Sequence, residues 1–384
     1  MADTVNLPQA ARNLRALIES EAQAVEEGGA MTLAIVDALV EADLFRLYTP
    51  ADLGGHEADV DTIIDVCEEL AFADGSVGWS FAQNTSVLAY SAYLAPEFAR
   101  PLAAARAAAG MFAPLGTAAR KEGGFEVSGN YKFGSGSGHA EFMGGAAMVM
   151  VDGEMAPFID GLPEIRGFIV PSDRVEFKGN WDVMGLCGTG SVDFDVPLQF
   201  VEDGRTFLLF EPPVITGGAI FGLGPIVLGT ISSTAWAIGV ARRALHEVAE
   251  LARSGRIRLG SLPLREQPTF QRDFGRHATA LRAARLLARD AYRAAVAAWA
   301  NGARGTELMV HLRETRAAAT YTAQIAKAAA SFAWEASGSA GMRNPSLLQR
   351  CFRDLCIGVG HQVFDERNFV EVAKPALGVE PEIF

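Results

Sequence analysis

The spacing of apolar residues changes twice along the chain, and each change marks a different kind of structure. From residue 7 to about residue 108, apolar positions recur every three or four residues, as in the segment 60–72, which predicts amphipathic helices. Pro50 and two glycines interrupt this pattern in the segment 49–55 and favour a loop there. A second interruption ends at Ser76, a residue type that can cap the next helix. The first part of the chain is therefore predicted to be helical.

A period of two residues replaces the helical spacing between about residues 110 and 201. The segment 124–133 alternates apolar and polar residues, which is typical of a half-buried strand. Further short runs of β-forming residues, separated by Gly, Pro and Asp, occupy 144–151, 165–171 and 192–196. This part of the chain predicts a small antiparallel sheet or barrel.

Helical spacing returns at about Ile226 and continues through most of the remaining chain. Ala, Leu and Arg dominate three long segments, 235–253, 270–300 and 308–338. Gly302 and Gly305 lie between the last two and predict the turn of an αα-hairpin.

The order of helical, β and helical parts predicts an α+β fold that is mostly α. We expect an N-terminal helical domain over 1–108, a central antiparallel β-sheet or β-barrel domain over 109–205 and a C-terminal helical domain over 206–384. The stretch between Glu211 and Arg242 has no charge and is long enough to cross a bilayer, but its prolines, glycines and hydroxyl residues favour a loop and a buried helix. No membrane-spanning helix is expected.

Composition narrows the function classes. The chain has 384 residues, 49% of them hydrophobic and 21% charged, which is typical of a globular protein. The 33 basic and 46 acidic residues give a net charge of −13, which argues against non-specific binding to nucleic acid or to an anionic membrane. The four cysteines have no paired C-x-x-C spacing, so neither a disulfide framework nor a structural metal is expected. The first residues lack the pattern of an export signal, and a cytoplasmic location is expected.

Several common nucleotide and catalytic motifs are absent from the sequence. The segment 222–225 resembles the start of G-x-G-x-x-G, but Val227 replaces the third glycine. The run 134–138 lacks the Gly-Lys-Ser/Thr end of a P-loop, and Gly136 occupies the serine position of a nucleophile elbow. These absences exclude the usual Rossmann, P-loop and α/β-hydrolase sites.

Two loops combine glycine, hydroxyl groups and an aromatic or imidazole ring. They are the segments 133–139 and 181–191, and each adjoins a predicted strand. Glycine permits close approach of the backbone, hydroxyls supply hydrogen bonds, and a ring supplies a flat wall, which together suit a planar heterocycle with polar edges. Each loop alone is also compatible with an ordinary turn between strands.

Taken in order with other segments, these loops resemble the acyl-CoA dehydrogenase superfold, and within it the two-component flavin-dependent monooxygenases that hydroxylate aromatic substrates. The matching segments extend over nearly the whole chain: 50–55, 73–79, 133–139, 181–191, and 348–354 with His361. The resemblance implies a C-terminal four-helix bundle, a homotetramer, and a reduced flavin, FMN or FAD, that a separate flavin reductase supplies. It implies that the flavin reacts with O2 to form a C4a-hydroperoxide, which hydroxylates a small aromatic substrate.

The resemblance also implies a set of site residues. His361 and Ser137 are the expected catalytic residues, with Ser135 an alternative source of the hydroxyl near the flavin. Trp79, Asn84 and His139 are expected to contact the substrate. The cofactor is expected to be bound by Ser135, Gly136, Trp181, Thr189, Ser191, Arg256, Arg258, Gly338 and Ser339, with Arg256 and Arg258 reaching its phosphate from a neighbouring subunit. The pair Arg353 and Asp354 is expected to form an ion pair that fixes a helix.

Dehydrogenases of this superfold need a carboxylate base, and here Gln362 stands at the position where it is expected. An amide is not basic near pH 7. His361 suits an oxygenase better, because an imidazole can hold positive charge or deprotonate a phenol near neutral pH. An acyl-CoA dehydrogenase that uses Glu247 or Glu250 remains the alternative, and a flavin-binding protein without activity is a third interpretation.

Overall fold

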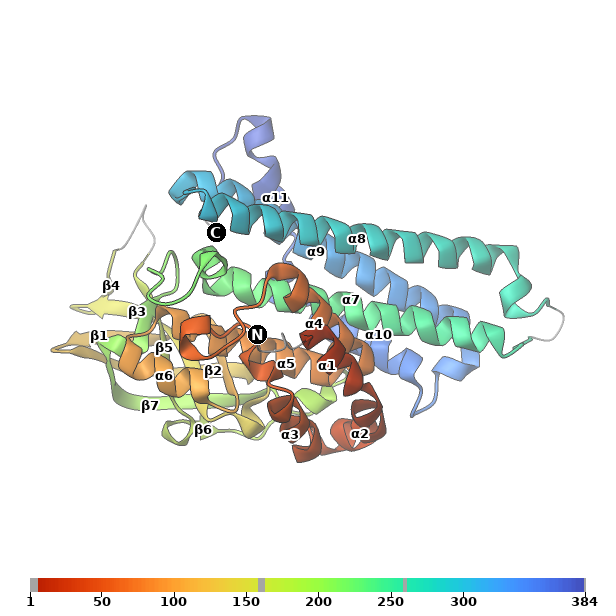
Figure 1. Ribbon diagram of the computed structural model, residues 1–384, viewed down its shortest axis with the longest axis horizontal. Coiled ribbons are helices and arrows are strands. Elements are labelled where there is room, and N and C mark those ends of the chain that lie inside the picture. The colour runs from red at the N-terminus through yellow and green to blue at the C-terminus, as the bar shows by residue number, and fades with distance from the viewer. Residues whose placement is uncertain (1–5, 158–162, 258–260, 383–384) are drawn as a thin grey trace.

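The fold was analysed in a computed structural model, which describes residues 6–157, 163–257 and 261–382 (Figure 1). Helices form the first part of the chain, as the spacing predicts. They are α1 (Leu7–Asn13), α2 (Arg15–Gly28), α3 (Leu33–Glu41), α4 (Val60–Ala73), α5 (Gly75–Leu88) and α6 (Pro96–Ala104). The cap of α5 differs from the expected one: Asp74, not Ser76, accepts hydrogen bonds from the backbone N–H of Ser76 and Val77, at 2.9 and 3.0 Å.

A single twisted sheet follows. Its strands are β1 (Ala108–Lys121), β2 (Gly124–Gly134), β3 (Phe142–Val151), β4 (Glu154–Met155), β5 (Ile165–Pro171), β6 (Glu176–Phe177), β7 (Val192–Glu202) and β8 (Thr206–Leu208). They run in the order β6-β7-β2-β1-β3-β5-β8, with β4 paired to β3. The sheet is mixed, because β3 joins the free edge of β1 after the β1–β2 hairpin and so runs parallel to β1. The other strand pairs are antiparallel, as predicted.

Long helices make up the rest of the molecule, on the side of α4 and α5 away from the sheet (Figure 1). They are α7 (Gly224–Arg253), α8 (Pro268–Ala300), α9 (Gly305–Ser337), α10 (Leu347–Gly358) and the short α11 (Arg367–Ala373). Helices α8 and α9 form the predicted αα-hairpin, and α7 and α10 pack against α9 to complete a bundle. The α+β, mostly α, fold class is confirmed.

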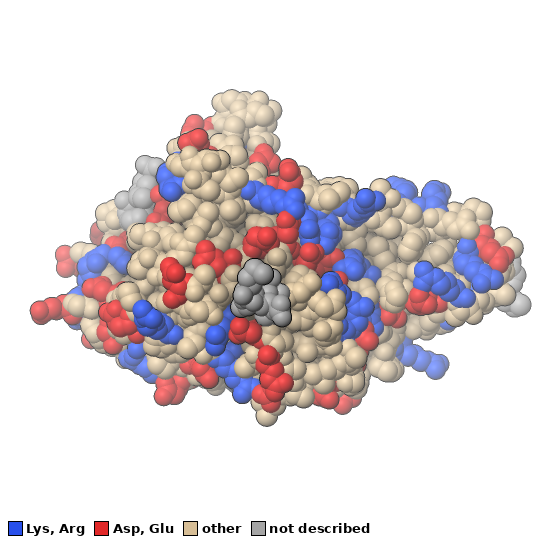
Figure 2. Space-filling view, viewed as in Figure 1, with Lys and Arg blue, Asp and Glu red and all other residues tan. Residues whose placement is uncertain are grey.

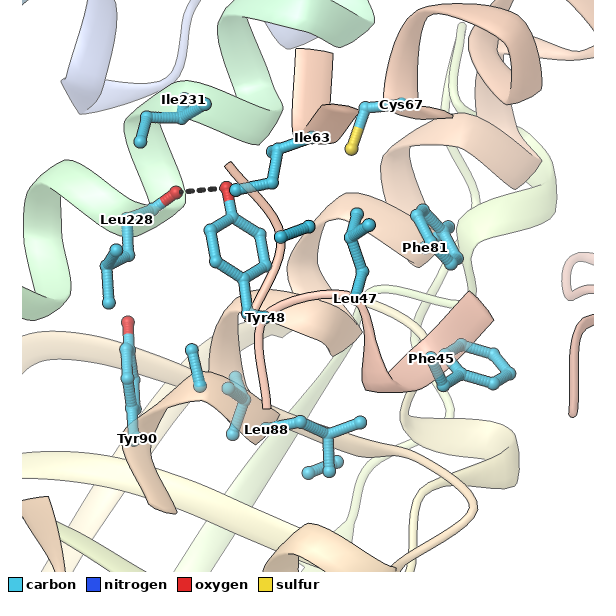
Figure 3. Close-up of a cluster of buried hydrophobic side chains, with 14 of the residues drawn as sticks. Phe45, Leu47, Tyr48, Ile63, Cys67, Phe81, Leu88, Tyr90, Leu228 and Ile231 are labelled. Atoms are coloured by element: carbon cyan, nitrogen blue, oxygen red, sulfur yellow. Dashed lines mark hydrogen bonds between the residues drawn. The ribbon is translucent and has the colours of Figure 1, made fainter. Parts of the chain in front are cut away.

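The largest hydrophobic core joins the N-terminal helices to α7 and to the sheet. Figure 3 shows Tyr48 at its centre, where its hydroxyl donates a hydrogen bond to the carbonyl of Leu228 at 3.0 Å. Tyr48 is fully buried, so this bond satisfies a polar group that would be costly to bury alone. The core therefore fixes α7 against the N-terminal helices and sets one wall of the pocket described below.

Helix α7 with the turn before it, Ala219–Arg253, is long and apolar enough to cross a membrane by composition. In the folded chain 83% of its most apolar window is buried inside the protein. It packs between α4, α5 and α9, which identifies it as a core helix, as the sequence predicts.

The face of the molecule in Figure 2 carries basic and acidic side chains side by side. Several are joined in ion pairs between α4 and α8, such as Arg285 with Asp65 at 2.7 Å and Arg289 with Asp61 at 3.2 Å. Alternating charge of this kind gives no broad positive field, in agreement with the net charge of −13.

Candidate active site

A pocket of about 750 Å³ lies between the sheet and the helices. Helix α5, the start of α7, strand β1 and the end of strand β2 form much of its wall, and the chain from the end of α10 into α11 closes it. Five of the predicted site residues line it: Trp79, Ser135, Trp181, Ser191 and His361. We call this cavity the active-site pocket.

The faces of α5 and α7 that line the pocket follow helical geometry. On α5 the lining residues are Trp79, Gln83, Ser86 and Val87, which share one face at intervals of three or four residues, and Tyr90 lines the pocket from the turn that follows α5. On α7 the lining residues between Pro225 and Ser233 are spaced in the same way. Two rigid helices therefore hold one side of the pocket.

Buried hydroxyl groups connect the two glycine-rich loops. The indole N–H of Trp79 donates to Ser135 Oγ at 3.0 Å, and Ser135 Oγ lies 2.7 Å from Ser191 Oγ. Thr189 Oγ1 lies 2.7 Å from Ser191 Oγ and donates to the carbonyl of Leu186 at 2.8 Å. All three hydroxyl residues are at most 5% exposed. The chain of hydrogen bonds fixes loop 133–139 to loop 181–191 and to α5.

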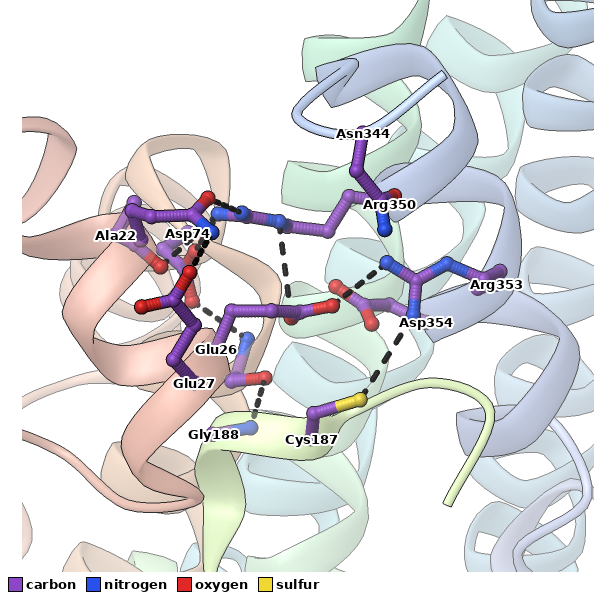
Figure 4. A network of polar contacts seen from close by, with 12 residues as sticks. Ala22, Glu26, Glu27, Asp74, Cys187, Gly188, Asn344, Arg350, Arg353 and Asp354 are labelled. Atoms are coloured by element: carbon purple, nitrogen blue, oxygen red, sulfur yellow. Dashed lines mark hydrogen bonds and ion pairs between the residues drawn. The ribbon is translucent and has the colours of Figure 1, made fainter. Parts of the chain in front are cut away.

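Helix α10 holds loop 181–191 in place (Figure 4). Asp354 accepts a hydrogen bond from the backbone N–H of Leu186 at 2.7 Å. Arg353 forms an ion pair with Glu26 at 2.6 Å and donates to the carbonyl of Met184. The expected ion pair between Arg353 and Asp354 is therefore wrong, because each side chain is used by a different partner. Burial, and then the nearby Asp74 carboxylate, raise the pKa of Asp354 to about 7.

Ser76, which was expected to cap α5, instead binds loop 181–191. Ser76 Oγ accepts a hydrogen bond from the backbone N–H of Gly188 at 3.2 Å. A Cβ atom on Gly188 would lie 2.1 Å from a methyl group of Val25, so only glycine fits there. This glycine serves close packing between the loop and α2.

His361 lies at the pocket wall beside Trp79, with ring centroids 5.6 Å apart in an edge-to-face arrangement. Its Nδ1 atom accepts a hydrogen bond from the backbone N–H of Val363 at 3.3 Å, which places the proton of the neutral ring on Nε2. Burial lowers the pKa of His361 to about 4. The ring is therefore uncharged at neutral pH, which favours a base or hydrogen-bonding role over holding positive charge.

Other predicted residues do not line the pocket. Asn84 is fully buried and donates to the carbonyl of Ala108 at 2.8 Å, while its Oδ1 atom lies 2.8 Å from His139 Nε2. Ser137 is buried and its hydroxyl is 3.4 Å from the carbonyl of Gly190. Gly136, with φ +71°, and Thr189 do not line the pocket either, and the Gly136 N–H donates to the Thr189 carbonyl at 2.8 Å, which joins the two loops.

The predicted phosphate-binding residues gather elsewhere, at the end of the bundle where α7 is followed by α8 (Figure 1). The guanidinium of Arg256 donates to Ser339 Oγ at 2.8 Å, and Gly338 precedes this serine with φ +57°. None of the three lines the active-site pocket. Arg258 lies outside the described residues.

Neither candidate base of the dehydrogenase alternative lines the pocket. Glu247 accepts a hydrogen bond from Arg243 at 2.7 Å, one turn away on α7. Glu250 forms an exposed ion pair with Arg253. Gln362, which does line the pocket, carries no carboxylate.

Sequence reasoning missed several pocket residues. Gln83 lines the pocket and donates to Ser233 Oγ at 3.3 Å, whereas its predicted neighbour Asn84 does not. Successive helical residues point about 100° apart, so the position of Trp79 at i−4 was the signal that selects Gln83. Tyr90, Phe112 and Arg316 come from three different elements, and no sequence spacing joins them.

The composition of the wall fits a flavin. The indole rings of Trp79 and Trp181 and the hydroxyls of Ser135 and Ser191 face one cavity. The Trp181 indole is itself oriented by donating to the carbonyl of Leu186 at 3.2 Å. Flat rings beside fixed polar groups are what a tricyclic cofactor with hydrogen-bonding edges requires.

Comparison with known proteins places this geometry in a family. The acyl-CoA dehydrogenase N-terminal domain matches residues 7–97 and the acyl-CoA dehydrogenase C-terminal domain matches residues 231–366, together more than half of the chain. The chain is 28% identical to an indole-3-acetate monooxygenase of Pseudomonas putida over 353 residues, which cover 90% of this chain and 87% of that protein. It is 27% identical to the flavin-dependent monooxygenase oxygenase subunit HsaA of Mycobacterium tuberculosis over 401 residues, which cover 99% and 97%.

Solved structures show the same fold. The HsaA monooxygenase of M. tuberculosis superimposes with a TM-score of 0.88 at 22% identity and covers 99% of both chains. XiaF of Streptomyces sp., solved in complex with FADH2 and glycerol, superimposes with a TM-score of 0.85 at 21% identity and covers 98% of this chain and 96% of that one. The chain therefore belongs to the acyl-CoA dehydrogenase family, and within it to the flavin-dependent monooxygenases that act as oxygenase components of two-component systems.

Proposed function

We propose that this chain hydroxylates a small aromatic substrate with reduced FMN or FAD and O2. The observation that carries the proposal is the wall of the active-site pocket, where the neutral His361 lies beside Trp79 and Gln362 stands at the position of the dehydrogenase base. The carboxylates that the described residues place in this wall, Asp365, Glu371 and Glu382, are engaged by Arg367 and Lys374. A separate flavin reductase supplies the reduced flavin, as the likeness to oxygenase subunits of such systems supports. Bound reduced flavin supplies two electrons, so that one atom of O2 enters the substrate and the other leaves as water.

The residues proposed to hold the flavin are Trp79, Ser135, Trp181 and Ser191. The Trp181 indole provides a flat wall, and Ser135 and Ser191 provide hydroxyls whose orientation is fixed by their mutual hydrogen bond. Because these groups are ordered before the cofactor arrives, less free energy is lost in arranging them around it. The buried position of the hydroxyls also keeps bulk water away from the polar edge of the cofactor.

His361 is proposed to accept a proton from the substrate. The Val363 N–H occupies Nδ1, so the neutral ring reaches the pocket through Nε2. With the proton on Nε2, the neutral ring donates a hydrogen bond to a substrate hydroxyl and orients it beside the flavin wall. To accept the proton of that hydroxyl at Nε2, the ring must adopt its other neutral tautomer, in which Nδ1 carries the proton and the contact with the Val363 N–H is lost. Without a base at position 361, the substrate hydroxyl would stay protonated and its ring would be less reactive.

The second part of the proposal concerns the assembly of subunits. Arg256 and Ser339 lie together at the end of the bundle and do not line the active-site pocket of their own subunit. We propose a homotetramer in which this pair meets the flavin phosphate bound in a neighbouring subunit, and a cytoplasmic location. Sedimentation equilibrium tests the assembly: a mass near four times 40.8 kDa supports it, and a mass of 40.8 kDa overturns it.

The oxygenase and dehydrogenase activities are distinguished with one preparation. Protein loaded with oxidised flavin is mixed anaerobically with a panel of acyl-CoA thioesters, and protein loaded with reduced flavin is mixed with O2 and a panel of phenols and indoles. Hydroxylated product in the second experiment, with no flavin reduction in the first, supports the proposal. Flavin reduction by a thioester that Glu247→Gln or Glu250→Gln abolishes would support the dehydrogenase instead, and no turnover in either would support an inactive flavin-binding protein.

A further inference from the structure

One part of the active-site pocket is charged. Arg316 from α9 lines it together with Asp365, Arg367 and Glu371, which come from the segment around α11, and with Glu382 near the end of the described chain. Lys132 near the end of β2 is a further charged residue of the lining, and much of the remaining wall is apolar or aromatic. This charged part determines which polar group a substrate can place there.

The carboxylates in this part already have cations of their own. Arg367 donates to Asp365 at 2.9 and 3.1 Å. Lys374 bridges Glu371 and Glu382, at 2.6 and 3.0 Å. The negative charge of the wall is thus engaged in ion pairs around α11.

Two arginines on the facing helix add positive charge. Arg313 is one turn from Arg316 on α9, is 7% exposed, and has a buried Nε atom without a hydrogen-bond partner among the described residues. Burial and the neighbouring Arg313 both lower the pKa of Arg316, and Glu371 opposes them. The described residues of this cluster are four cations and three anions, namely Arg313, Arg316, Arg367 and Lys374 against Asp365, Glu371 and Glu382. The local charge is therefore positive by one unit.

The pocket that Arg316 lines also has an apolar and aromatic wall. Tyr90, Phe112, Leu209 and Phe210 line the same pocket, and the Tyr90 and Phe112 rings meet edge to face at 4.8 Å between centroids. Such a wall accommodates an aromatic ring, and a guanidinium has five N–H donors that match a carboxylate. Binding one more acceptor does not require that Arg316 lack other contacts.

We propose that the substrate is an aromatic carboxylate, whose ring lies against the apolar wall and whose carboxylate is bound by Arg316. The proposal rests on the function proposed above, because it takes this pocket as the substrate site. Arg313 acts as a positioning residue that keeps the potential at Arg316 positive. A neutral aromatic of the same shape would not form this charge-assisted hydrogen bond with Arg316.

Equilibrium binding tests the substrate class without turnover. The full-length protein loaded with oxidised flavin is titrated calorimetrically with indole-3-acetate, phenylacetate and 3-phenylpropionate, and with the amide of each. At least one carboxylate should bind about tenfold or more tightly than its amide, the effect of one charge-assisted hydrogen bond. Arg316→Gln should remove this preference while leaving the affinity for the amide unchanged, and Arg316→Lys should retain part of it.

Lys327→Gln is the matched control, since Lys327 is an exposed cation on the same helix and does not line the pocket. It should leave the preference intact. If no carboxylate of the panel binds more tightly than its amide, or if Arg316→Gln keeps the preference while thermal unfolding shows it folded, the inference is overturned. Oxygenation of a neutral aromatic in the same preparation would then show that the proposed function stands without it, whereas absence of oxygenation with every aromatic tested would reject the function itself.

Discussion

Asp354 on α10 and Leu186 in loop 181–191 are joined by a 2.7 Å hydrogen bond across 168 residues of sequence. The carbonyl of the same Leu186 accepts hydrogen bonds from the Trp181 indole and from the Thr189 hydroxyl, at 3.2 and 2.8 Å. One buried carboxylate in the helical bundle therefore sets the orientation of a ring and a hydroxyl on the sheet side of the pocket.

Replacing Asp354 by Asn should keep the acceptor for Leu186 and remove a buried charge. The pKa of Asp354 is raised to about 7 in the folded protein from 3.8, so the folded chain holds this proton where the unfolded chain releases it. Stability from this group is present below pH 4 and is lost as the pH rises towards 7. Relative to the wild type, Asp354→Asn should therefore gain roughly 1–4 kcal/mol between pH 4.5 and pH 8.

Urea unfolding at the two pH values measures this difference. Asp354→Ala is the companion variant, because it also lacks the titrating carboxyl but leaves the Leu186 N–H without an acceptor. It should shift with pH as Asp354→Asn does and should be about 1–3 kcal/mol less stable than Asp354→Asn at both pH values. An Asp354→Asn variant whose stability relative to the wild type does not change with pH would contradict the raised pKa.

Ser135 and Ser137 offer a second matched pair. Ser135→Ala should weaken binding of reduced flavin by about 2–10-fold, because one hydroxyl is removed from the pocket wall and the Trp79 indole loses its acceptor. Ser137→Ala, two residues away and outside the lining, should bind reduced flavin as the wild type does. Anaerobic titration followed by tryptophan fluorescence measures both. Equal losses in the two variants would show that the hydroxyl network is not the flavin contact.

Gln83 and Asn84 are adjacent in sequence but should respond differently to substitution. Gln83→Leu should change the KM for substrate and leave stability nearly unchanged, because Gln83 faces the pocket. Asn84→Leu should cost about 1–3 kcal/mol of stability, because the Ala108 carbonyl and the His139 ring lose a buried partner. Steady-state kinetics and urea unfolding separate the effects, and a KM effect confined to Asn84 would reverse the assignment.

Much of the fold could be predicted from periodicity alone. The segment 124–133 became β2, and the long Ala-rich segments became α7, α8 and α9, because each buries a face of the expected period. The parallel pairing of β1 with β3 could not be predicted, since it depends on which edge of the β1–β2 hairpin the next strand joins.

The site residues in the glycine-rich loops could be predicted from sequence, whereas those that only tertiary packing brings to the pocket could not. Ser135, Trp181, Ser191 and His361 line one pocket although they are up to 226 residues apart in the chain. Asn84 and His139 were expected there from the family resemblance, but they do not line the pocket and instead contact each other at 2.8 Å. The place of Arg316 in the pocket wall, on which its proposed role rests, follows from the packing of α9 against α11, which no local sequence pattern indicates.

His361 should show an unusual pH dependence. Its pKa of about 4 means that the imidazole remains neutral above that value and gains a proton only as the pH falls towards 4. The rate of hydroxylation should therefore show no inflection near 6.5 that His361→Gln removes. Product analysis between pH 4.5 and 8 checks this, and His361→Gln should lower product formation about 100-fold or more if the ring accepts the substrate proton. An inflection near 6.5 in the wild type that is absent from the variant would contradict the neutral ring.

The central claim is that reduced flavin bound in the pocket beside Trp79, Ser135 and Trp181 delivers one oxygen atom to a substrate. The most direct measurement is a single turnover, in which protein holding one equivalent of FMNH2 or FADH2 is mixed with ¹⁸O2 and the aromatic panel and the product is analysed by mass spectrometry. The account predicts a hydroxylated product with one ¹⁸O atom and at most one product molecule per flavin. Flavin oxidation that yields only hydrogen peroxide with every substrate and with both flavins would contradict it.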